Sequence, residues 1–430
     1  MSTALLTDQY ELTMLDAAIG SGRHERQCVF EVFARRLPDS RRYGIVAGTG
    51  RLLELIEEFR FGDEELSFLS RNSIVSPTTI DWLANYRFTG DISGYREGDA
   101  YFPGSPVLTV EGTFAEAVLL ETLALSVLNY DSAVASAAAR MVSAAGARPI
   151  AEMGSRRTGE RSAVASARAA YIAGFSATSN LEAGRSWGVP TMGTAAHSFT
   201  LLHDSEEEAF QAQVDALGPS TTLLVDTYDV ENAVELAVKV AGTGLGAVRI
   251  DSGDLATQVA SVRAQLDSLG ATKTRITVTN DLDEHAIAAL RAAPVDSFGV
   301  GTSVVTGSGY PAAGMVYKLV AHHNDAGEWV SVAKKSAAKA TVGGHKAAIR
   351  TMENGVATSE LIYQTEGARP DVEGRELIVP LMTAGTADAQ WLGDGGTLAA
   401  RDHREDAMAE LPQTAFRLSR GEPVLPTLYR

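Results

Sequence analysis

The 430-residue chain has a single cysteine, Cys28, so it cannot form an internal disulfide. This composition fits a reducing compartment, and we expect a cytoplasmic protein. Residues 1–20 include acidic side chains but no lysine or arginine, so they lack the positively charged start of a signal peptide. The most apolar helical pattern, at 115–130, is interrupted by Glu116 and Glu121, which argues against a membrane span.

Basic residues are also scarce, with 37 lysines and arginines against 54 aspartates and glutamates and a formal net charge of −17. Such an acidic chain argues against nucleic acid as a partner. An acidic substrate would therefore need a local cationic pocket. One window without acidic residues suits either a solvated loop or a flap that closes on phosphates, and it contains Lys334, Lys335, Lys339, His345, Lys346 and Arg350.

The chain does contain a repeating pattern of short apolar segments, each followed by polar residues. The segments lie near 148–153, 175–178, 189–193, 221–226, 246–250, 274–279 and 296–300. Helical patterns lie between them, at 160–173, 205–217, 230–240, 255–269 and 283–292. This alternation predicts a parallel sheet with right-handed crossovers. Because parallel strands end at a common rim, we expect their polar residues to converge there.

The number of strands favours an α/β barrel, regular or irregular, over an open doubly wound sheet. Met315–Val320 is a candidate eighth strand, and no G-x-G-x-x-G motif opens the region to suggest a dinucleotide site. We predict three parts: an N-terminal α/β domain with a linking helix at 1–130, the barrel at 131–322, and a C-terminal segment at 323–430. The pattern at 113–146 predicts two helices that separate near Tyr130-Asp131.

The segment V-R-I-D-S-G-D-L, at 248–255, places a cation and carboxylates at one strand end. Arg249 stands in an otherwise apolar strand, and its guanidinium suits a two-pronged grip on a carboxylate. Asp251 suits a hydroxyl pair or a Mg²⁺ ion held through water, because hard cations prefer oxygen ligands. Ser252 or Asp254 is expected to cap the following helix.

Other strand ends carry further candidates. Gly301-Thr302 suits either close approach to a phosphate or an ordinary turn. His197 suits a general base, a metal ligand, a phosphoryl acceptor or a structural role. Arg156-Arg157 forms either a solvated turn or part of a site, and Thr178-Ser179-Asn180 has no assigned role. Taken together, these strand ends predict a phosphorylated, polyanionic substrate with Mg²⁺.

The chain resembles the nicotinate phosphoribosyltransferases over most of its length, from Leu6–Met14 to Val316–Val320 and on to Arg350. Matching stretches are Phe30–Pro38, Gly154–Thr158, Gly193–Phe199, Leu224–Tyr228, Val248–Leu255, Asn280–Glu284 and Phe298–Thr306. The resemblance implies a type II phosphoribosyltransferase fold, which is an irregular α/β barrel with an N-terminal α/β domain, in a homodimer. It also implies that nicotinate and phosphoribosyl pyrophosphate form nicotinate mononucleotide and pyrophosphate, with ATP hydrolysis coupled, in NAD salvage.

The resemblance also carries roles to individual residues. It implies that His197 is transiently phosphorylated, that Tyr10 and Thr194 contact nicotinate, and that Arg249 engages the nicotinate carboxylate. Thr302 falls in the phosphoribosyl-binding turn. From their positions at strand ends we assign phosphate, ribose or Mg²⁺ contacts to Arg156, Arg157, Asp251, Ser252, Asp281 and Gly301. The sequence G-S-R-R-T at 154–158 departs from the family's commoner G-x-R-R-A but keeps both arginines.

Three alternatives remain open from the sequence. The nearest is a phosphoribosyltransferase that prefers nicotinamide or quinolinate, although a buried arginine facing the ring substituent favours a single carboxylate. The second is a metal-dependent hydrolase that uses Asp251, Asp254, Asp281 and His197. The third is a ligand sensor or scaffold without catalysis.

Overall fold

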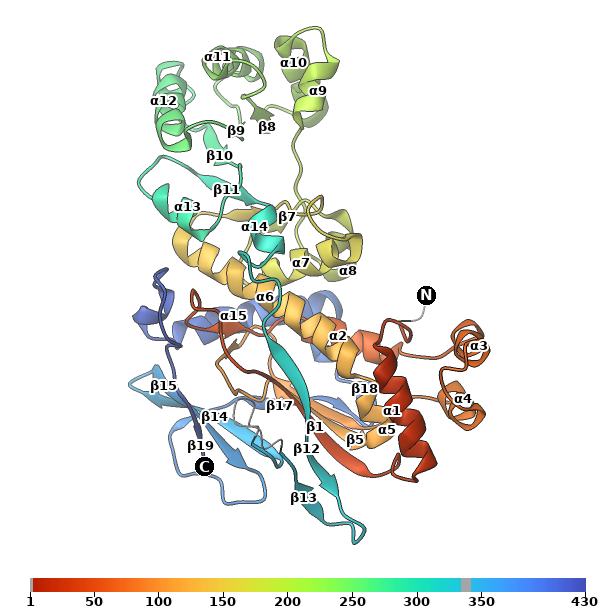
Figure 1. Cartoon of the computed structure of the whole chain (residues 1–430). Helices are drawn as coiled ribbons and strands as arrows, with labels where there is room; N and C mark the ends of the chain where they lie inside the picture. The colour runs from red at the N-terminus through yellow and green to blue at the C-terminus, as the bar shows by residue number, and fades with distance from the viewer. Residues whose placement is uncertain (1–2, 334–341) are drawn as a thin grey trace. The chain divides into compact units, whose positions relative to one another are not determined.

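The computed structural model describes residues 3–333 and 342–430. The chain forms two compact units, one built from residues up to Ser136 and from Tyr310 onward, the other from Ala137–Gly309 (Figure 1). This arrangement differs from the three consecutive parts predicted from the sequence. β12 (Met315–His323) pairs along its length with β1 (Gln27–Ala34), and the C-terminal segment joins the same sheet because its β17 (Ile378–Thr383) pairs with β3 (Asp91–Tyr95).

The first unit is organised around a seven-stranded sheet with the order β13-β12-β1-β5-β3-β17-β18. β1 is antiparallel to both neighbours, and Phe30 lies opposite Leu319 of β12. The rings of Phe30 and Tyr317 stack with centroids 4.9 Å apart. The prediction that Met315–Val320 is an eighth barrel strand is therefore wrong, since an apolar strand pattern does not specify which sheet the strand joins.

The first unit contains further strands and helices. Its other strands are β2 (Gly44–Ile45), β3 (Asp91–Tyr95), β4 (Ala100–Tyr101), β5 (Leu108–Thr113), β13 (Trp329–Ser331), β17 (Ile378–Thr383) and β18 (Thr386–Ala387). A second sheet, ordered β16-β14-β15-β19, contains β14 (Lys346–Glu353), β15 (Val356–Gln364), β16 (Gly374–Glu376) and β19 (Thr427–Tyr429). The helices of the first unit, apart from the segment after β5, are α1 (Gln9–Gly20), α2 (Thr49–Glu57), α3 (Asp63–Arg71), α4 (Pro77–Ala84) and α15 (Gly393–Ala409).

The helical segment after β5 contains α5 (Phe114–Val118) and α6 (Glu121–Ala145), so its break falls at Leu119-Leu120. The predicted break at Tyr130-Asp131 is wrong. Asp131 is buried and accepts two hydrogen bonds from Arg51, at 3.1 and 2.8 Å, so this polar residue does not interrupt the helix. By length and composition Phe114–Ala145 qualifies as a membrane span, but 67% of its apolar window is buried, as in the core helix of a soluble protein.

Two residues of the basic window, Lys346 and Arg350, belong to buried ion pairs. Lys346 lies 2.8 Å from Glu31, and burial raises the pKa of Glu31 to about 6 although Lys346 opposes the rise. Arg350 is fully buried and pairs with Asp99 at 2.7 Å and with Glu360 at 2.5 Å. Lys334, Lys335 and Lys339 lie outside the described residues.

The second unit contains the predicted parallel sheet as an open half-barrel with the order β7-β6-β11-β10-β9-β8. Its strands are β6 (Ile150–Glu152), β7 (Ala177–Thr178), β8 (Thr222–Leu224), β9 (Ala247–Ile250), β10 (Arg275–Val278) and β11 (Ser297–Val300). The predicted strand at 189–193 forms only a bridge between Thr191 and Thr178. The other six predicted strands are confirmed, because each is a short buried apolar segment bounded by turns.

Helices alternate with these strands. They are α7 (Glu160–Ile172), α8 (Leu181–Trp187), α9 (His197–Leu202), α10 (Glu206–Leu217), α11 (Val230–Ala241), α12 (Leu255–Ser268), α13 (Glu284–Ala289) and α14 (Thr302–Val305). Asp254 caps α12 by accepting a hydrogen bond from the Thr257 amide at 3.4 Å, as the sequence predicts for one of two residues. The parallel pairing brings the carboxyl ends of β6, β9, β10 and β11 to one rim of the sheet.

Candidate active site

A cavity of about 560 Å³ lies at this rim of the second unit. Of the residues predicted from strand ends, the structure brings together Arg156, Arg157, Thr194, Arg249, Asp251, Asp281, Gly301 and Thr302. Others that line it are Met153, Ser155, Ser179, Met192, Gly193, Ala195, Ala196, Thr279, Asn280 and Gly299. The lining holds three arginines against two carboxylates. This locally positive balance, within a chain of net charge −17, is what binding of a polyanion requires.

Arg249 is the most firmly held cation of the cavity, and its side chain is 15% exposed. Its Nε donates to Thr279 Oγ1 at 2.8 Å, and one terminal nitrogen lies 3.2 Å from Asp251 Oδ2. The other terminal nitrogen makes longer contacts to Thr194 Oγ1, at 3.4 Å, and to the Ala195 carbonyl. Thr279 Oγ1 in turn donates to Asp251 at 2.5 Å. Thr279, which sequence reasoning missed, thus orients both a cation and a carboxylate.

His197 is the first residue of α9, and its imidazole is bound to Asp226 rather than lining the cavity. Nε2 donates to Asp226 Oδ1 at 3.1 Å, and the histidine side chain is 41% exposed while that of Asp226 is 1% exposed. Asp226 Oδ2 also accepts from the Asp251 amide at 2.9 Å and from Ser252 Oγ at 2.7 Å. A buried carboxylate that holds one nitrogen of a histidine leaves the other nitrogen available for chemistry.

Asp226 was not assigned a role from the sequence. Its position two residues after the end of β8 was visible as one more polar strand end, but its pairing with His197 depends on how α9 packs. Ser252, a predicted substrate contact, instead donates to Asp226. The structure thereby connects the strand ends of β8 and β9 to the histidine.

Glu152 holds the start of the loop that contains Arg156 and Arg157. This buried carboxylate accepts from the Gly154 amide and from Thr178 Oγ1, at 2.5 and 2.6 Å. Burial raises its pKa, while these hydrogen bonds oppose the rise. A β-carbon at Gly154 would lie 2.1 Å from Val305 Cγ1, so the loop needs glycine there.

The strand end at 178–180, which had no assigned role, supports the same loop. Asn180 Nδ2 donates to Ser155 Oγ at 3.0 Å, and its Oδ1 accepts from the Ala183 amide to cap α8. The Asn180 amide also donates to Thr178 Oγ1 at 3.0 Å. The neighbouring Ser179 lines the cavity. This segment therefore helps to fix the position of the two arginines.

The loops after β10 and β11 complete the rim. Asn280 has φ +102°, a region that residues with side chains rarely occupy and that is often held at functional sites. Gly299 cannot carry a β-carbon without meeting Thr279 Cγ2 at 2.6 Å and Met153 Sδ at 2.7 Å. The absence of side chains at Gly299 and Gly301 lets a ligand approach the backbone that leads to Thr302.

The predicted Mg²⁺ role of Asp251 can be compared with the donors present. Among residues 3–333 and 342–430, no group of three or more histidine, cysteine, aspartate or glutamate side chains is placed to hold an ion. Mg²⁺ at phosphate sites is usually held by one or two carboxylates together with substrate phosphates and water. Asp251 and Asp281, which both line the cavity, fit an ion that arrives with a phosphorylated substrate.

Tyr10 lies on α1 of the other unit and is 45% exposed. Partial burial and the nearby carboxylate of Glu121 raise its pKa to about 12, so the phenol stays protonated at neutral pH. Its contact with nicotinate remains a prediction.

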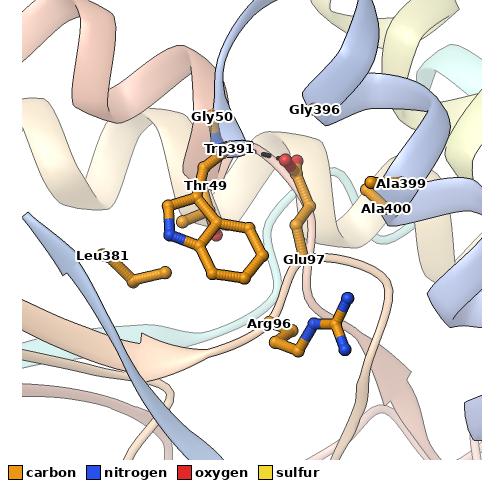
Figure 2. A pocket seen from close by; sticks show the side chains of 9 residues that line it. All are labelled: Thr49, Gly50, Arg96, Glu97, Leu381, Trp391, Gly396, Ala399 and Ala400. Atoms are coloured by element: carbon orange, nitrogen blue, oxygen red, sulfur yellow. Dashed lines mark hydrogen bonds between the residues drawn. The ribbon is translucent and has the colours of Figure 1, made fainter. Parts of the chain in front are cut away.

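A second cavity, shown in Figure 2, belongs to the first unit and measures about 10 Å³. Glu97 accepts from the Gly50 amide at 3.1 Å beside it, and Arg96 lies 5.6 Å from the ring centre of Trp391. The space is enough for about one water molecule. It is too small for a substrate, whereas the rim cavity of about 560 Å³ contains eight of the residues predicted from strand ends and is the candidate active site.

Comparisons with known proteins agree with this fold. Residues 5–129 match the nicotinate phosphoribosyltransferase N-terminal domain, and residues 149–365 match the nicotinate phosphoribosyltransferase family. A nicotinate phosphoribosyltransferase of Mycobacterium tuberculosis is 56% identical over 98% of this chain and 94% of its own length. The enzyme of that name from Bacillus subtilis is 37% identical over 84% of this chain and 76% of its own length.

Solved structures agree with the fold. The crystal structure of human nicotinic acid phosphoribosyltransferase matches with a TM-score of 0.84 and 25% identity, over 99% of this chain and 97% of that one. A nicotinate-nucleotide pyrophosphorylase from Pyrococcus furiosus matches in fold with a TM-score of 0.77. The half-barrel and its rim thus define a type II phosphoribosyltransferase fold, as predicted. Within that class, the chain belongs to the nicotinate phosphoribosyltransferase family.

Proposed function

We propose that this protein transfers the phosphoribosyl group of phosphoribosyl pyrophosphate to nicotinate, in the salvage of NAD. The observation that carries the proposal is the fixed guanidinium of Arg249 in a cavity that also contains Arg156, Arg157 and the Gly301-Thr302 turn. One arginine suits a ring carboxylate, and the other groups suit phosphates. Membership of the family supports the same substrates.

In this reaction the bond from ribose C1 to pyrophosphate breaks, and the pyridine nitrogen of nicotinate forms the new bond to C1. Positive charge develops on the ribose ring, while pyrophosphate leaves as an anion. Arg156 and Arg157 stabilise the leaving anion, and Arg249 orients the ring by its carboxylate. Mg²⁺, when bound, would neutralise pyrophosphate charge beside Asp251 and Asp281.

The cavity favours nicotinate over its close relatives. A ring carboxylate offers a guanidinium two charged acceptor oxygens, whereas an amide offers one neutral oxygen, which disfavours nicotinamide. Quinolinate has a second carboxylate and needs another cation. Arg249 already shares its guanidinium with Asp251 at 3.2 Å. A single ring carboxylate is therefore the best match.

ATP coupling through His197 forms the second part of the proposal. Since Asp226 binds Nε2 at 3.1 Å, Nδ1 is the nitrogen available to attack the γ-phosphorus of ATP. ADP then leaves, and water later cleaves the phosphohistidine to free phosphate. The negative charge added to His197 would alter the hydrogen bonds of Asp226. Because Asp226 also binds the Asp251 amide, this change would affect the cavity.

We further propose a cytoplasmic homodimer. Leu201 and Leu202, beside His197 on α9, are 61% and 77% exposed, and Leu6 and Met14 are exposed on or next to α1. Large exposed apolar side chains of this kind are typical of association surfaces. Sedimentation at several protein concentrations would test the dimer.

Substrate choice tests the proposal. With phosphoribosyl pyrophosphate and Mg²⁺ present, we expect product from nicotinate and little from equal nicotinamide or quinolinate. Faster turnover of either competitor would contradict the proposed substrate. Activity that needs no phosphoribosyl pyrophosphate would instead support the hydrolase alternative, and tight binding without turnover would support a sensor.

A further inference from the structure

Two loops that line the cavity are joined by one buried carboxylate, that of Glu284. The loop with Asn280 and Asp281 runs directly into α13, which begins at Glu284. The turn Gly301-Thr302 begins α14, and the chain after that helix reaches Ser308. Glu284 is 4% exposed and accepts a hydrogen bond from Ser308 Oγ at 2.8 Å. The hydrogen bond therefore connects the chain segments that follow the two loops.

The other oxygen of Glu284 is fixed by Arg140 of α6. Arg140 Nε donates to Oε1 at 3.0 Å, and each side chain is only 5% exposed. Separating a buried ion pair is costly, because each charge would then lack its partner in a poorly solvating interior. The carboxylate thus has a defined position from which it can hold Ser308.

The chain around Ser308 has a backbone that depends on such support. Gly307, Ser308 and Gly309 have φ values of +60°, +52° and +86°. Serine rarely adopts this conformation, and the surrounding structure must maintain it. The Ser308 amide donates to the Ser303 carbonyl at 2.7 Å, which ties the residue to α14. Ser308 is therefore attached to α14 by its backbone and to Glu284 by its side chain.

We infer that Glu284 and Ser308 are positioning residues that keep the Gly301-Thr302 turn at a fixed position relative to Asn280-Asp281. Neither lines the cavity, so they act through the loops and not by contact with substrate. This inference rests on the proposed function, in which these loops bind the phosphoribosyl substrate. Affinity for phosphoribosyl pyrophosphate should then depend on the Glu284–Ser308 hydrogen bond, while affinity for nicotinate should not.

Ser308→Ala and Ser308→Gly test this dependence, since both remove the hydroxyl and the glycine also relieves the backbone. We expect each variant to raise KM for phosphoribosyl pyrophosphate about tenfold, equivalent to about 1.4 kcal/mol, with KM for nicotinate unchanged. The matched control is Ser176→Ala, which removes a 3.0 Å hydroxyl bond to the Ile150 carbonyl at the amino end of β6. The control should keep both KM values.

Glu284→Gln provides a second variant, because a glutamine oxygen can satisfy only one of the two donors. It should show the same KM increase with a lower melting temperature. If it does not fold, the Ser308 variants still decide the question. A Ser308 variant with unchanged KM and a lower melting temperature would overturn the inference and make the contact merely structural.

Hydrogen exchange separates failure of this inference from failure of the proposed function. In the ligand-free protein, Ser308→Ala should speed amide exchange in residues 301–309, and Ser176→Ala should not. Unchanged exchange in that segment would contradict the inference whatever the activity. Lack of nicotinate mononucleotide formation by the unmodified protein would contradict the proposed function and leave the exchange result intact.

Discussion

At the scale of single residues, Arg249 is the side chain whose replacement is expected to alter substrate choice most. Arg249→Gln removes the charge that faces the nicotinate carboxylate, so kcat/KM for nicotinate should fall about 100-fold, as expected for a hydrogen bond to a charged group. Turnover of nicotinamide relative to nicotinate should rise. Initial-rate assays with both substrates measure the change.

Arg275→Gln is the control for this variant, since Arg275 is exposed and begins the neighbouring strand β10. It should leave both rates unaltered. If Arg249→Gln kept the preference for nicotinate, the carboxylate would be bound elsewhere.

His197 gives a separate prediction about ATP. His197→Ala should abolish ATP hydrolysis and ATP stimulation while slow phosphoribosyl transfer continues. Asp226→Asn should weaken ATP stimulation as well, because its amide group can no longer accept hydrogen bonds on both sides. His203→Ala, which removes a contact to the Phe199 carbonyl, is the control. Stimulation by ATP that survives in His197→Ala would rule out the phosphohistidine.

At the scale of elements, the strand-end loops depend on glycines that allow close packing. Gly154→Ala would place a methyl group 2.1 Å from Val305 Cγ1, between the arginine loop and α14. We expect a loss of about 1–3 kcal/mol in the free energy of unfolding, measured by denaturant titration. Gly244→Ala should change little, because no atom lies within 4 Å of the position that its β-carbon would take. Equal stability of the two variants would mean that the loop accommodates the methyl group.

The sequence could predict the rim of the sheet because its signals are local. Each parallel strand is a short apolar run, and the polar residues that follow it must lie at one edge, as Asp251, Asp281 and Thr302 do. Contacts between distant segments left no such signal. The sequence does not show that Glu152 binds Thr178, which lies 26 positions later. It also does not show that α9 brings His197 to Asp226.

The same limit explains the errors. An alternating apolar segment such as Met315–Val320 predicts a strand but not its neighbour, so its pairing with β1 was missed. The basic window gave a correct count of charges, but Lys346 and Arg350 have acidic partners far away in the sequence. Burial of such pairs is a property of tertiary structure.

At the scale of the whole molecule, the Glu31–Lys346 pair predicts how stability varies with pH. Burial raises the pKa of Glu31 from 4.5 to about 6, so the folded state holds this proton more strongly than the unfolded state. The contribution of Glu31 to stability therefore falls as pH rises from about 4.5 to about 6. The double variant Glu31→Gln with Lys346→Met has no carboxyl group to lose this proton. Between pH 4 and pH 7 its free energy of unfolding should therefore rise by about 2 kcal/mol relative to that of the unmodified protein.

Chemical unfolding at a series of pH values measures this difference. A gap between the two proteins that stays constant with pH would show that the pKa of Glu31 is not raised.

The most direct test of the central claim is product formation by the whole protein. Purified chain would be incubated with nicotinate, phosphoribosyl pyrophosphate and Mg²⁺, with and without ATP, and products would be separated by chromatography. The proposed function predicts nicotinate mononucleotide and pyrophosphate in equal amounts, formed faster with ATP. No nicotinate mononucleotide under either condition would contradict it.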